Sequence, residues 1–422
     1  MKIKLTSVVA ALGALVFLGS GHHAVADSGS WSQKTAPLMT RWAKEVTPEN
    51  VHQEYPRPQL TRTDWMNLNG LWDYSVVSRD QSQPESFQGK ILVPFPIESA
   101  LSGVMKTVSD QEQIWYQKTF SLPQDWRDQK TILHFGASDW ETTVYVNDQK
   151  VGSHKGGYTA FSMDITSALV EGSEQKLTVS VWDPTSTGTQ PRGKQINNPH
   201  GIWYTPTSGI WQTVWLEPVS HNYIENLKLT PDIDEKSITV SVSTVTEPKA
   251  TLEWSVIVLD AGKQIAEAEL IIEQGGETGG ANPRFVLGVK EPKLWSPDSP
   301  FLYDLKVTLK KDGKAIDEVR SYFGMRKIHV GKDQAGINRL MLNNKPLFQF
   351  GPLDQGFWPD GLYTAPSDEA LKYDLEVTKQ LGFNMARKHV KIEPDRWYYH
   401  CDKMGILVWQ DMPSGDKYIG TK

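Results

Sequence analysis

The sequence predicts a multidomain protein with two β-sandwich domains followed by a segment in which strands and helices alternate. The chain has 422 residues, more than one hydrophobic core usually supports. From about Leu60 to Val330, short runs rich in β-branched and aromatic residues are separated by turn residues, a pattern typical of antiparallel sandwiches. After Gly331 strand-like and helix-like patterns alternate, which indicates a parallel sheet.

The first 26 residues have the order of a secretory signal. Lys2 and Lys4 supply a positive start, residues 8–18 form an apolar run, and small residues end at Ala26. We therefore expect cleavage after Ala26 and a secreted or periplasmic protein. The apolar run is too short for an ordinary transmembrane helix, and no later stretch approaches the twenty apolar residues that a span needs. No membrane contact is expected after cleavage.

Charge and cysteine content exclude several classes. The chain carries 44 basic and 50 acidic residues, a formal charge of −6. Nucleic acid is not expected as a partner, because phosphate binding needs clustered positive charge. The one cysteine, Cys401, cannot form an internal disulfide. We expect it to be a small apolar residue on a helix.

The first sandwich is predicted over residues 59–218, after an N-terminal segment of residues 27–58. Its expected strands lie at 70–76, 115–120, 143–147, 177–181 and 213–216. Asn147-Asp148 marks a tight hairpin turn.

A second, smaller sandwich is predicted over residues 219–330, a length that suits an immunoglobulin-like domain. Strands are expected at 237–242 and 254–258. The glycine cluster at 275–280 lacks the Lys-Ser/Thr pair of a phosphate-binding loop, so we interpret it as a flexible hairpin loop.

Residues 331–422 predict a βαβαβ unit. Ser367 can cap a helix that ends at Leu381-Gly382, with Ala370, Leu371, Leu375 and Leu381 among the apolar residues facing the sheet. The other expected elements are an apolar run at 347–350, a strand at 383–389, a helix at 394–404 and a strand at 406–409.

Several motifs in this order resemble glycoside hydrolase family 2, the group of β-galactosidases, β-glucuronidases and β-mannosidases. The resemblance covers about residues 59–422. The motifs are Ile114-Trp115-Tyr116-Gln117-Lys118-Thr119-Phe120, Ser208-Gly209-Ile210-Trp211-Gln212, Leu294-Trp295-Ser296-Pro297, Tyr322-Phe323-Gly324-Met325-Arg326, Asn384-Met385-Ala386-Arg387-Lys388-His389 and Gly405-Ile406-Leu407-Val408-Trp409-Gln410-Asp411.

The resemblance implies a jelly-roll sugar-binding domain at 59–218, the immunoglobulin-like domain at 219–330, and the first three strands of a (β/α)8 TIM barrel at 331–422. It also implies a retaining exo-β-glycosidase, with β-galactosidase the first expectation and glucuronide or mannoside substrates left open. Retention needs two carboxyl groups. In the family both are glutamates on later barrel strands, and Glu369, Glu376 and Glu393 match neither motif. We therefore expect the 422-residue chain alone to be inactive.

Substrate-binding residues are expected at the carboxyl ends of the barrel strands. Arg387 and His389 lie two apart on one strand and so share a face; by resemblance, both adjoin the sugar. Trp409 and Asp411 end the third strand, and Asp354 is a weaker candidate, as is Trp358. Packing or hydrogen bonds to loop carbonyls remain alternative roles for these residues.

No cofactor is expected, because the sequence contains no H-E-x-x-H, C-x-x-C or G-x-S-x-G motif. Metal dependence and oligomeric state stay open. A non-catalytic carbohydrate-binding or interaction protein remains the alternative to an enzyme, although a part-barrel would leave exposed strand edges.

Overall fold

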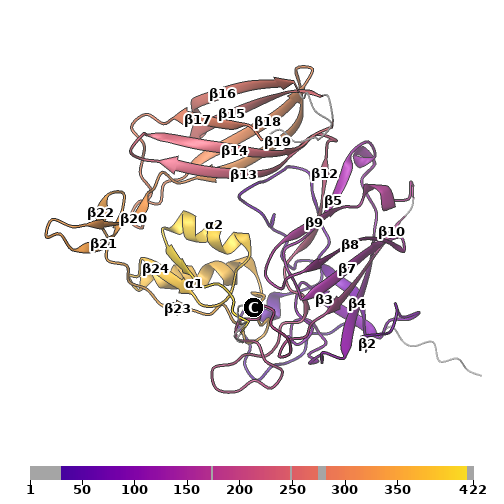
Figure 1. Ribbon diagram of the computed structural model, residues 1–422. Helices are drawn as coiled ribbons and strands as arrows, with labels where there is room; N and C mark the ends of the chain where they lie inside the picture. Colours follow the sequence, from indigo (N-terminus) through magenta and orange to yellow (C-terminus); the bar gives the residue numbers. More distant parts are fainter. Residues whose placement is uncertain (1–29, 173, 248–249, 274–281, 416–422) are drawn as a thin grey trace, which may run out of the picture.

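The computed structural model describes residues 30–172, 174–247, 250–273 and 282–415. The predicted signal at 1–26 and the predicted glycine loop at 275–280 lie outside these residues. The segment with alternating strands and helices lies beside the first sandwich and below the second (Figure 1). Among the described residues, no helix is long and apolar enough to cross a membrane.

The first sandwich follows the predicted strand pattern. A six-stranded sheet in the order β3-β2-β4-β10-β7-β8 packs on a four-stranded sheet in the order β1-β12-β5-β9, and β6 pairs with β11. The strands are β1 Met66–Asn67, β2 Gly70–Ser78, β3 Gly89–Val93, β4 Glu112–Phe120, β5 Lys130–Phe135, β6 Ser138–Asp139, β7 Glu141–Val146, β8 Gln149–Lys155, β9 Phe161–Asp164, β10 Gln175–Trp182, β11 Gly209–Ile210 and β12 Val214–Val219.

Alternation along these strands explains the core of the first sandwich. In β7, Thr142, Val144 and Val146 are buried while the residues between them are half-buried, as expected when successive side chains point to opposite faces. The predicted turn at Asn147-Asp148 joins β7 to β8, and both residues have positive φ, the geometry of a tight hairpin turn.

The second sandwich packs a sheet in the order β13-β14-β17 on one in the order β16-β15-β18-β19. Seven strands in two sheets are the arrangement of an immunoglobulin-like domain, which confirms the predicted sandwich. The strands are β13 Tyr223–Asp232, β14 Ser237–Val245, β15 Thr251–Asp260, β16 Lys263–Glu273, β17 Arg284–Gly288, β18 Tyr303–Lys311 and β19 Lys314–Phe323. Trp254 is buried in the core of this sandwich.

An antiparallel sheet follows the second sandwich, where strand–helix alternation was predicted to begin. It consists of β20 Ile328–Lys332, β21 Asn338–Leu342 and β22 Lys345–Pro346. The expected strand at 347–350 is wrong. These residues form no strand, and Asn384 holds them through hydrogen bonds to Phe348 and Phe350 instead. The parallel sheet begins later, at β23 Leu353–Asp354.

The βα segment comprises residues 353–410. Its elements are β23, α1 Asp368–Gln380, β24 Met385–Lys388, α2 Asp395–Met404 and β25 Leu407–Gln410. The three strands pair in parallel in the order β23-β24-β25. Three strands and two helices confirm the predicted βαβαβ unit; a closed barrel is not formed by the described residues.

Local sequence sets both helices. The Ser367 hydroxyl accepts a hydrogen bond from the Ala370 amide and caps α1. Gly405, in the left-handed conformation, ends α2. Ala370 and Leu375 are buried against the sheet as expected. Leu381 is not, because α1 ends at Gln380 and Leu381 lies past the buried stripe, 67% exposed.

The N-terminal segment from Ser30 to Pro58 contacts the first sandwich and the βα segment. Trp31 donates a hydrogen bond to the Ser102 carbonyl in the first sandwich. Thr40 donates to the Asp360 carboxylate in the loop after β23. These contacts bind the segment to parts of the chain that are distant in sequence.

A buried ion cluster joins the two sandwiches. Glu217 of β12 is fully buried, and its carboxylate lies 2.9 Å from the Arg57 guanidinium, 3.3 Å from that of Arg62 and 3.1 Å from His134 Nε2. Arg62 also pairs with Asp317 of β19 at 2.8 Å. One guanidinium therefore neutralises a carboxylate from each sandwich.

Candidate active-site rim

Strands β24 and β25 bring the predicted site residues together at their carboxyl ends. Arg387 pairs in register with Trp409, and Leu353 of β23 pairs with Arg387. Because paired residues of parallel strands share a face, these three side chains lie in one row. His389 and Asp411 directly follow their strands on the same side of the sheet.

Arg387, His389 and Asp411 form a hydrogen-bonded cluster that we call the rim triad. Arg387 Nε is 3.1 Å from both Asp411 oxygens, and its Nη2 is 3.0 Å from Oδ2. His389 Nδ1 is 2.9 Å from the same Oδ2. The Arg387 hydrogen bond, with help from His389, holds the pKa of Asp411 below its usual value.

This geometry fixes the direction of the histidine ring. An ionised Asp411 can only accept hydrogen bonds, so Nδ1 of His389 carries the proton it donates. Nε2 is then the ring nitrogen left for a ligand. Asp411 thus orients a ring nitrogen and a guanidinium toward the same side of the sheet.

Trp409 adds a flat surface beside the rim triad. Its side chain is 46% exposed, and its Nε1 donates a hydrogen bond to Gln349. A partly exposed indole next to hydrogen-bond donors suits the apolar face of a sugar ring.

Asp354 does not join the other four predicted residues. It lies within β23, not after the first strand, and its register partner is Lys388. Its carboxylate is 2.8 Å from Lys388 Nζ on the helix-facing side of the sheet. Trp358, the other weak candidate, is buried against α1 as part of a core cluster. Alternation along β23 and β24 separates Asp354 from the rim triad, and Trp358 lies in the loop after β23.

A buried charge network lies behind the rim and was not predicted. Glu393 Oε1 accepts hydrogen bonds from Lys388 Nζ at 2.8 Å and Lys391 Nζ at 2.9 Å. Lys391 also donates to the carbonyls of Gly356 and Tyr363 at 2.7 and 2.8 Å. One signal was present in the sequence: Lys388 sits between Arg387 and His389, so alternation must turn it inward.

The two lysines respond differently to burial. Burial lowers the pKa of Lys391 to about 8, and the attraction of Glu393 offsets this only in part. For Lys388 burial acts in the same direction, but Glu393 and Asp354 outweigh it and raise the pKa above its usual value.

Gly356 makes room for this network. Its φ is +58°, and a Cβ at this position would lie 2.1 Å from Glu393 Oε1. Any larger residue would push the glutamate off its lysines, so the turn after β23 requires glycine.

A loop of the first sandwich borders the rim, which the sequence did not reveal. The amides of Arg192 and Gly193 donate to the Ser414 carbonyl at 2.9 and 3.0 Å. Tyr204 packs on Phe357, with ring centroids 4.6 Å apart. The loop between β10 and β11 is therefore fixed against the loops that follow β23 and β25.

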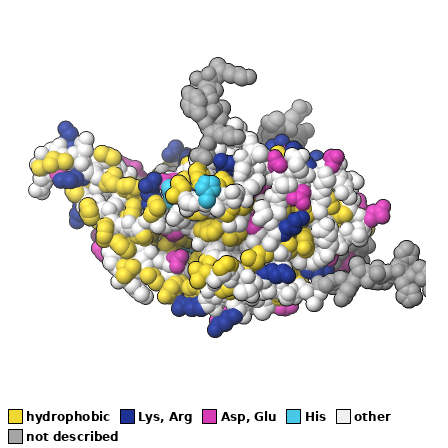
Figure 2. Space-filling model, turned by 90° about the horizontal axis from the view of Figure 1, so that it is seen from below, with side chains coloured by type: hydrophobic (Ala, Val, Ile, Leu, Met, Phe, Trp, Pro, Cys, Tyr) yellow, Lys and Arg dark blue, Asp and Glu magenta, His cyan; other side chains and the backbone are white. Residues whose placement is uncertain are grey.

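Hydrophobic side chains gather on the half of the molecule that carries β20–β22 and β23, on the left of Figure 2. Phe348, Phe350, Leu353 and Met412 are each more than half exposed. Leu353 shares its row with Arg387 and Trp409, so part of this apolar surface adjoins the rim triad.

Arg387 and His389 present hydrogen-bonding groups on one side of the sheet at the rim. The carboxyl groups at the rim and the three glutamates of the βα segment do not form a catalytic pair. Asp411 is engaged by Arg387 and His389, Glu393 is engaged by two lysines, and Glu369 and Glu376 lie on α1. The described residues also hold no group of three or more His, Cys, Asp or Glu suited to a metal ion.

Two sandwiches and a βα segment with this rim define a modular carbohydrate-active protein. The model of the glycosyl hydrolases family 2 sugar binding domain matches residues 65–217, and the model of glycosyl hydrolases family 2 matches residues 222–326. Together they match more than half of the chain, and the chain belongs to this family.

Relatives with known sequences carry more than one name. A β-galactosidase of Thermoanaerobacter pseudethanolicus is 27% identical over 329 residues, covering 73% of this chain and 40% of the relative. A β-glucuronidase of Paenibacillus borealis is 25% identical over 384 residues, covering 85% of this chain and 60% of the relative. The chain thus spans less than two thirds of either relative.

Solved structures share the fold. A putative β-galactosidase from Bacteroides fragilis superposes with a TM-score of 0.68 at 23% identity, over 83% of this chain and 53% of that one. The β-D-glucuronidase of Dictyoglomus thermophilum superposes with a TM-score of 0.66 at 23% identity, over 85% of this chain and 59% of that one.

Proposed function

We propose that this protein is a retaining exo-β-glycosidase in which the rim triad binds the sugar beside the scissile bond. The observation that carries this proposal is the rim triad itself: one carboxylate, Asp411, orients Arg387 and His389 at the carboxyl edge of a parallel sheet. Enzymes built on parallel βα units place their sites at this edge.

The donors of the rim triad suit sugar hydroxyls. The guanidinium of Arg387 presents several N–H groups in a fixed plane, and the bond to Asp411 uses only part of them. His389 offers Nε2. A sugar ring lying on Trp409 would bring its hydroxyls to both groups.

The parallel sheet is proposed to be the start of a (β/α)8 barrel. Support comes from the order β23-β24-β25 with a helix after each of the first two strands. The two catalytic glutamates are proposed to lie outside residues 1–422, and the 422-residue polypeptide is proposed to be inactive.

β-Galactosides are the proposed substrates, because a relative named β-galactosidase matches and Arg387 and His389 resemble the galactosidase and glucuronidase pattern. β-Glucuronides are the second candidate, since other relatives carry the name β-glucuronidase. Export after cleavage behind Ala26 is also proposed, from the charged, apolar and small-residue order of residues 1–26. Mass spectrometry of exported protein that retained Met1 would overturn the export proposal.

Activity assays separate these proposals. Aryl β-galactoside, β-glucuronide and β-mannoside should be offered to the 422-residue polypeptide and to the longest natural reading frame that contains it. We expect turnover of the galactoside by the longer protein only, lost on Arg387→Ala. Turnover by the 422-residue form that survives Arg387→Ala would contradict the assigned site.

A further inference from the structure

A large cavity lies where the N-terminal segment, both sandwiches and the βα segment meet. We call it the interdomain cavity. It encloses about 620 Å³, within the range of small-molecule sites. None of the five residues predicted for the rim lines it. It therefore requires an explanation separate from the rim.

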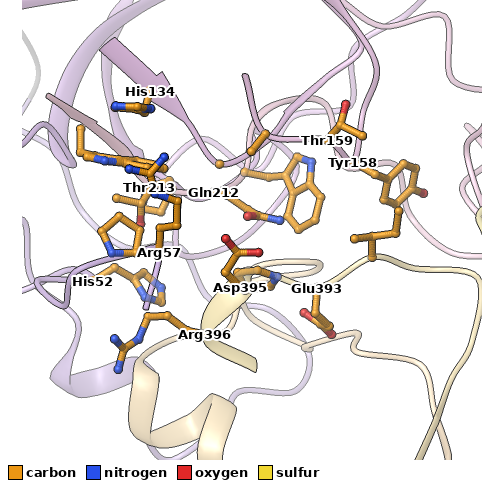
Figure 3. Close-up of a pocket in the computed structure, with 18 of the residues that line it drawn as sticks. His52, Arg57, His134, Tyr158, Thr159, Gln212, Thr213, Glu393, Asp395 and Arg396 are labelled. Carbon is orange, nitrogen blue, oxygen red and sulfur yellow. The ribbon is translucent and has the colours of Figure 1, made fainter. Parts of the chain in front are cut away.

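Each part of the chain contributes a polar wall to the interdomain cavity. Gln212 and Thr213 come from the first sandwich, Asn226 from the second, and Asp395 from the first turn of α2. In Figure 3, Gln212 and Asp395 point toward the middle of the cavity from opposite walls, and Tyr158 and Glu393 close one end.

The walls carry an excess of negative charge. Five carboxylates line the cavity against two guanidinium groups. The carboxylates belong to Glu54, Glu225, Asp368, Glu393 and Asp395. Asp368 pairs with Arg396, and Glu393 pairs with Lys388 and Lys391, which leaves three of the carboxylates without an ion pair among the described residues. Both arginines are already paired, Arg57 with Glu217 at 2.9 Å and Arg396 with Asp368 at 2.6 Å. The two histidines, His52 and His134, have pKa values that burial lowers further, so they add no positive charge at neutral pH.

Carboxylates of the cavity walls have acceptor oxygens without a hydrogen-bond partner. Oε2 of Glu54 and Oε2 of Glu393 are both buried and have no hydrogen-bond partner. Glu393 is itself 96% buried, 4% of its surface being exposed. Buried acceptors without partners are costly. The acceptors that a ligand in the cavity can reach are the carboxylates of Glu225 and Asp395, which belong to exposed residues and have no hydrogen-bond partner among the described residues.

We propose that the interdomain cavity is a second carbohydrate-binding site, which takes a neutral saccharide. Vicinal hydroxyls can donate to the carboxylates and can both donate to and accept from the Gln212 amide. Tyr158, Phe161 and Ile392 offer apolar surface to C–H faces. A uronate or a phosphorylated sugar is excluded, because its charge would face Glu54, Glu225 and Asp395, three carboxylates without an ion pair among the described residues. This site uses no rim residue, so it does not depend on the proposed enzyme activity.

Binding should be measured with the 422-residue protein. Lactose is titrated by calorimetry, and hydrogen–deuterium exchange locates it. Methyl β-glucoside and methyl β-glucuronide, which differ only at C6, test the charge argument. We expect lactose to protect residues 211–213 and 392–396, and the glucuronide to bind at least tenfold more weakly than the glucoside.

Two substitutions test the walls, each with a matched control. Gln212→Ala and Asp395→Asn should each weaken lactose binding roughly tenfold. Gln83→Ala and Asp128→Asn change the same residue types on the first sandwich outside the cavity and should leave binding unchanged. Asp395 is exposed at the start of α2, so its variant remains informative if Gln212→Ala does not fold.

The contrary results are distinct. Absence of lactose binding, equal affinity for glucoside and glucuronide, or unchanged affinity in both wall variants would overturn the proposal. Protection confined to residues 387–389 and 409–411 would also overturn it and would support sugar binding at the rim instead.

Discussion

The guanidinium of Arg387 and the carboxylate of Asp411 face each other across two neighbouring parallel strands, with Nε 3.1 Å from both carboxylate oxygens. Neither residue is deeply buried, so this pair adds little to stability. Its effect is geometric, because Asp411 also holds His389.

Removing Arg387 should raise the pKa of Asp411. The Arg387 hydrogen bond is the main reason that this pKa lies below its usual value, so Arg387→Ala should move it upward. Carbon-13 NMR titration of the aspartate carboxyls would show the change. His389→Ala should cause a smaller rise in the same direction. An Asp411 titration that is identical in all three proteins would contradict the described triad.

Glu217→Gln should destabilise the protein at neutral pH, and the penalty should fade in acid. Interactions with His134, Arg57 and Arg62 outweigh burial and lower the pKa of Glu217 to about 2. A carboxylate whose pKa is lower in the native than in the unfolded protein stabilises the fold at pH values above its unfolded pKa of about 4.5. This stabilisation is lost as the pH falls toward the native pKa of about 2. The contribution at pH 7 is on the order of 3 kcal/mol.

Urea denaturation at pH 7, 4.5 and 3 would measure this effect. The difference between wild type and Glu217→Gln should shrink with each step. Glu318→Gln removes an exposed carboxylate of β19 paired only at the surface and serves as the control. A difference that is constant with pH would show that Glu217 is not ionised in the folded protein.

Lys391 should make stability rise with pH above neutrality. Its native pKa of about 8 lies below the usual 10.5, so between these values the unfolded chain binds more protons than the native one. Stability therefore increases with pH in this window, by up to about 3 kcal/mol.

Comparison of wild type with Lys391→Met at pH 7.5, 9 and 10 isolates this contribution. The wild type should gain stability relative to the variant as pH rises. Lys372→Met, at an exposed helical ion pair, should show no such gain. Parallel curves for wild type and Lys391→Met would mean that Lys391 titrates normally.

The exposed apolar side chains should make the 422-residue polypeptide self-associate. Phe348 is 82% and Leu353 51% exposed, and both lie in the stretch that directly follows β22. The double variant Phe348→Ser, Leu353→Ser should be more monomeric in sedimentation velocity. Leu38→Ser, at an isolated exposed leucine, should change nothing. Equal association of all three proteins would contradict this prediction.

Hydrophobic alternation and the residues that mark helix ends predicted most of the fold. Val144 and Val146 alternate with polar neighbours, and Ser367 and Gly405 mark helix ends, because these signals depend only on local geometry. The strand predicted at 347–350 is wrong because a local signal does not include contacts with distant residues. Its apolar residues matched a strand, but Asn384, which lies 34 residues beyond Phe350, determines how it is held.

The candidate site was predictable only in part. The two-residue spacing of Arg387 and His389 placed them on one face, and strand order brought Asp411 beside them. The register that pairs Asp354 with Lys388, and the ion network around Glu393, depend on contacts between separate strands and loops. No single stretch of sequence contains them.

The position of Arg62 constrains how such a protein can be recombined. Its guanidinium forms ion pairs with Glu217 of the first sandwich and Asp317 of the second. Suppose that either sandwich were exchanged for that of a distant relative that lacks the corresponding carboxylate. Arg62 would then remain buried between the sandwiches with only one of its two carboxylate partners. Shuffling of these modules, in evolution or in the laboratory, should therefore succeed when both sandwiches move together with residues 57–62 and fail when one moves alone.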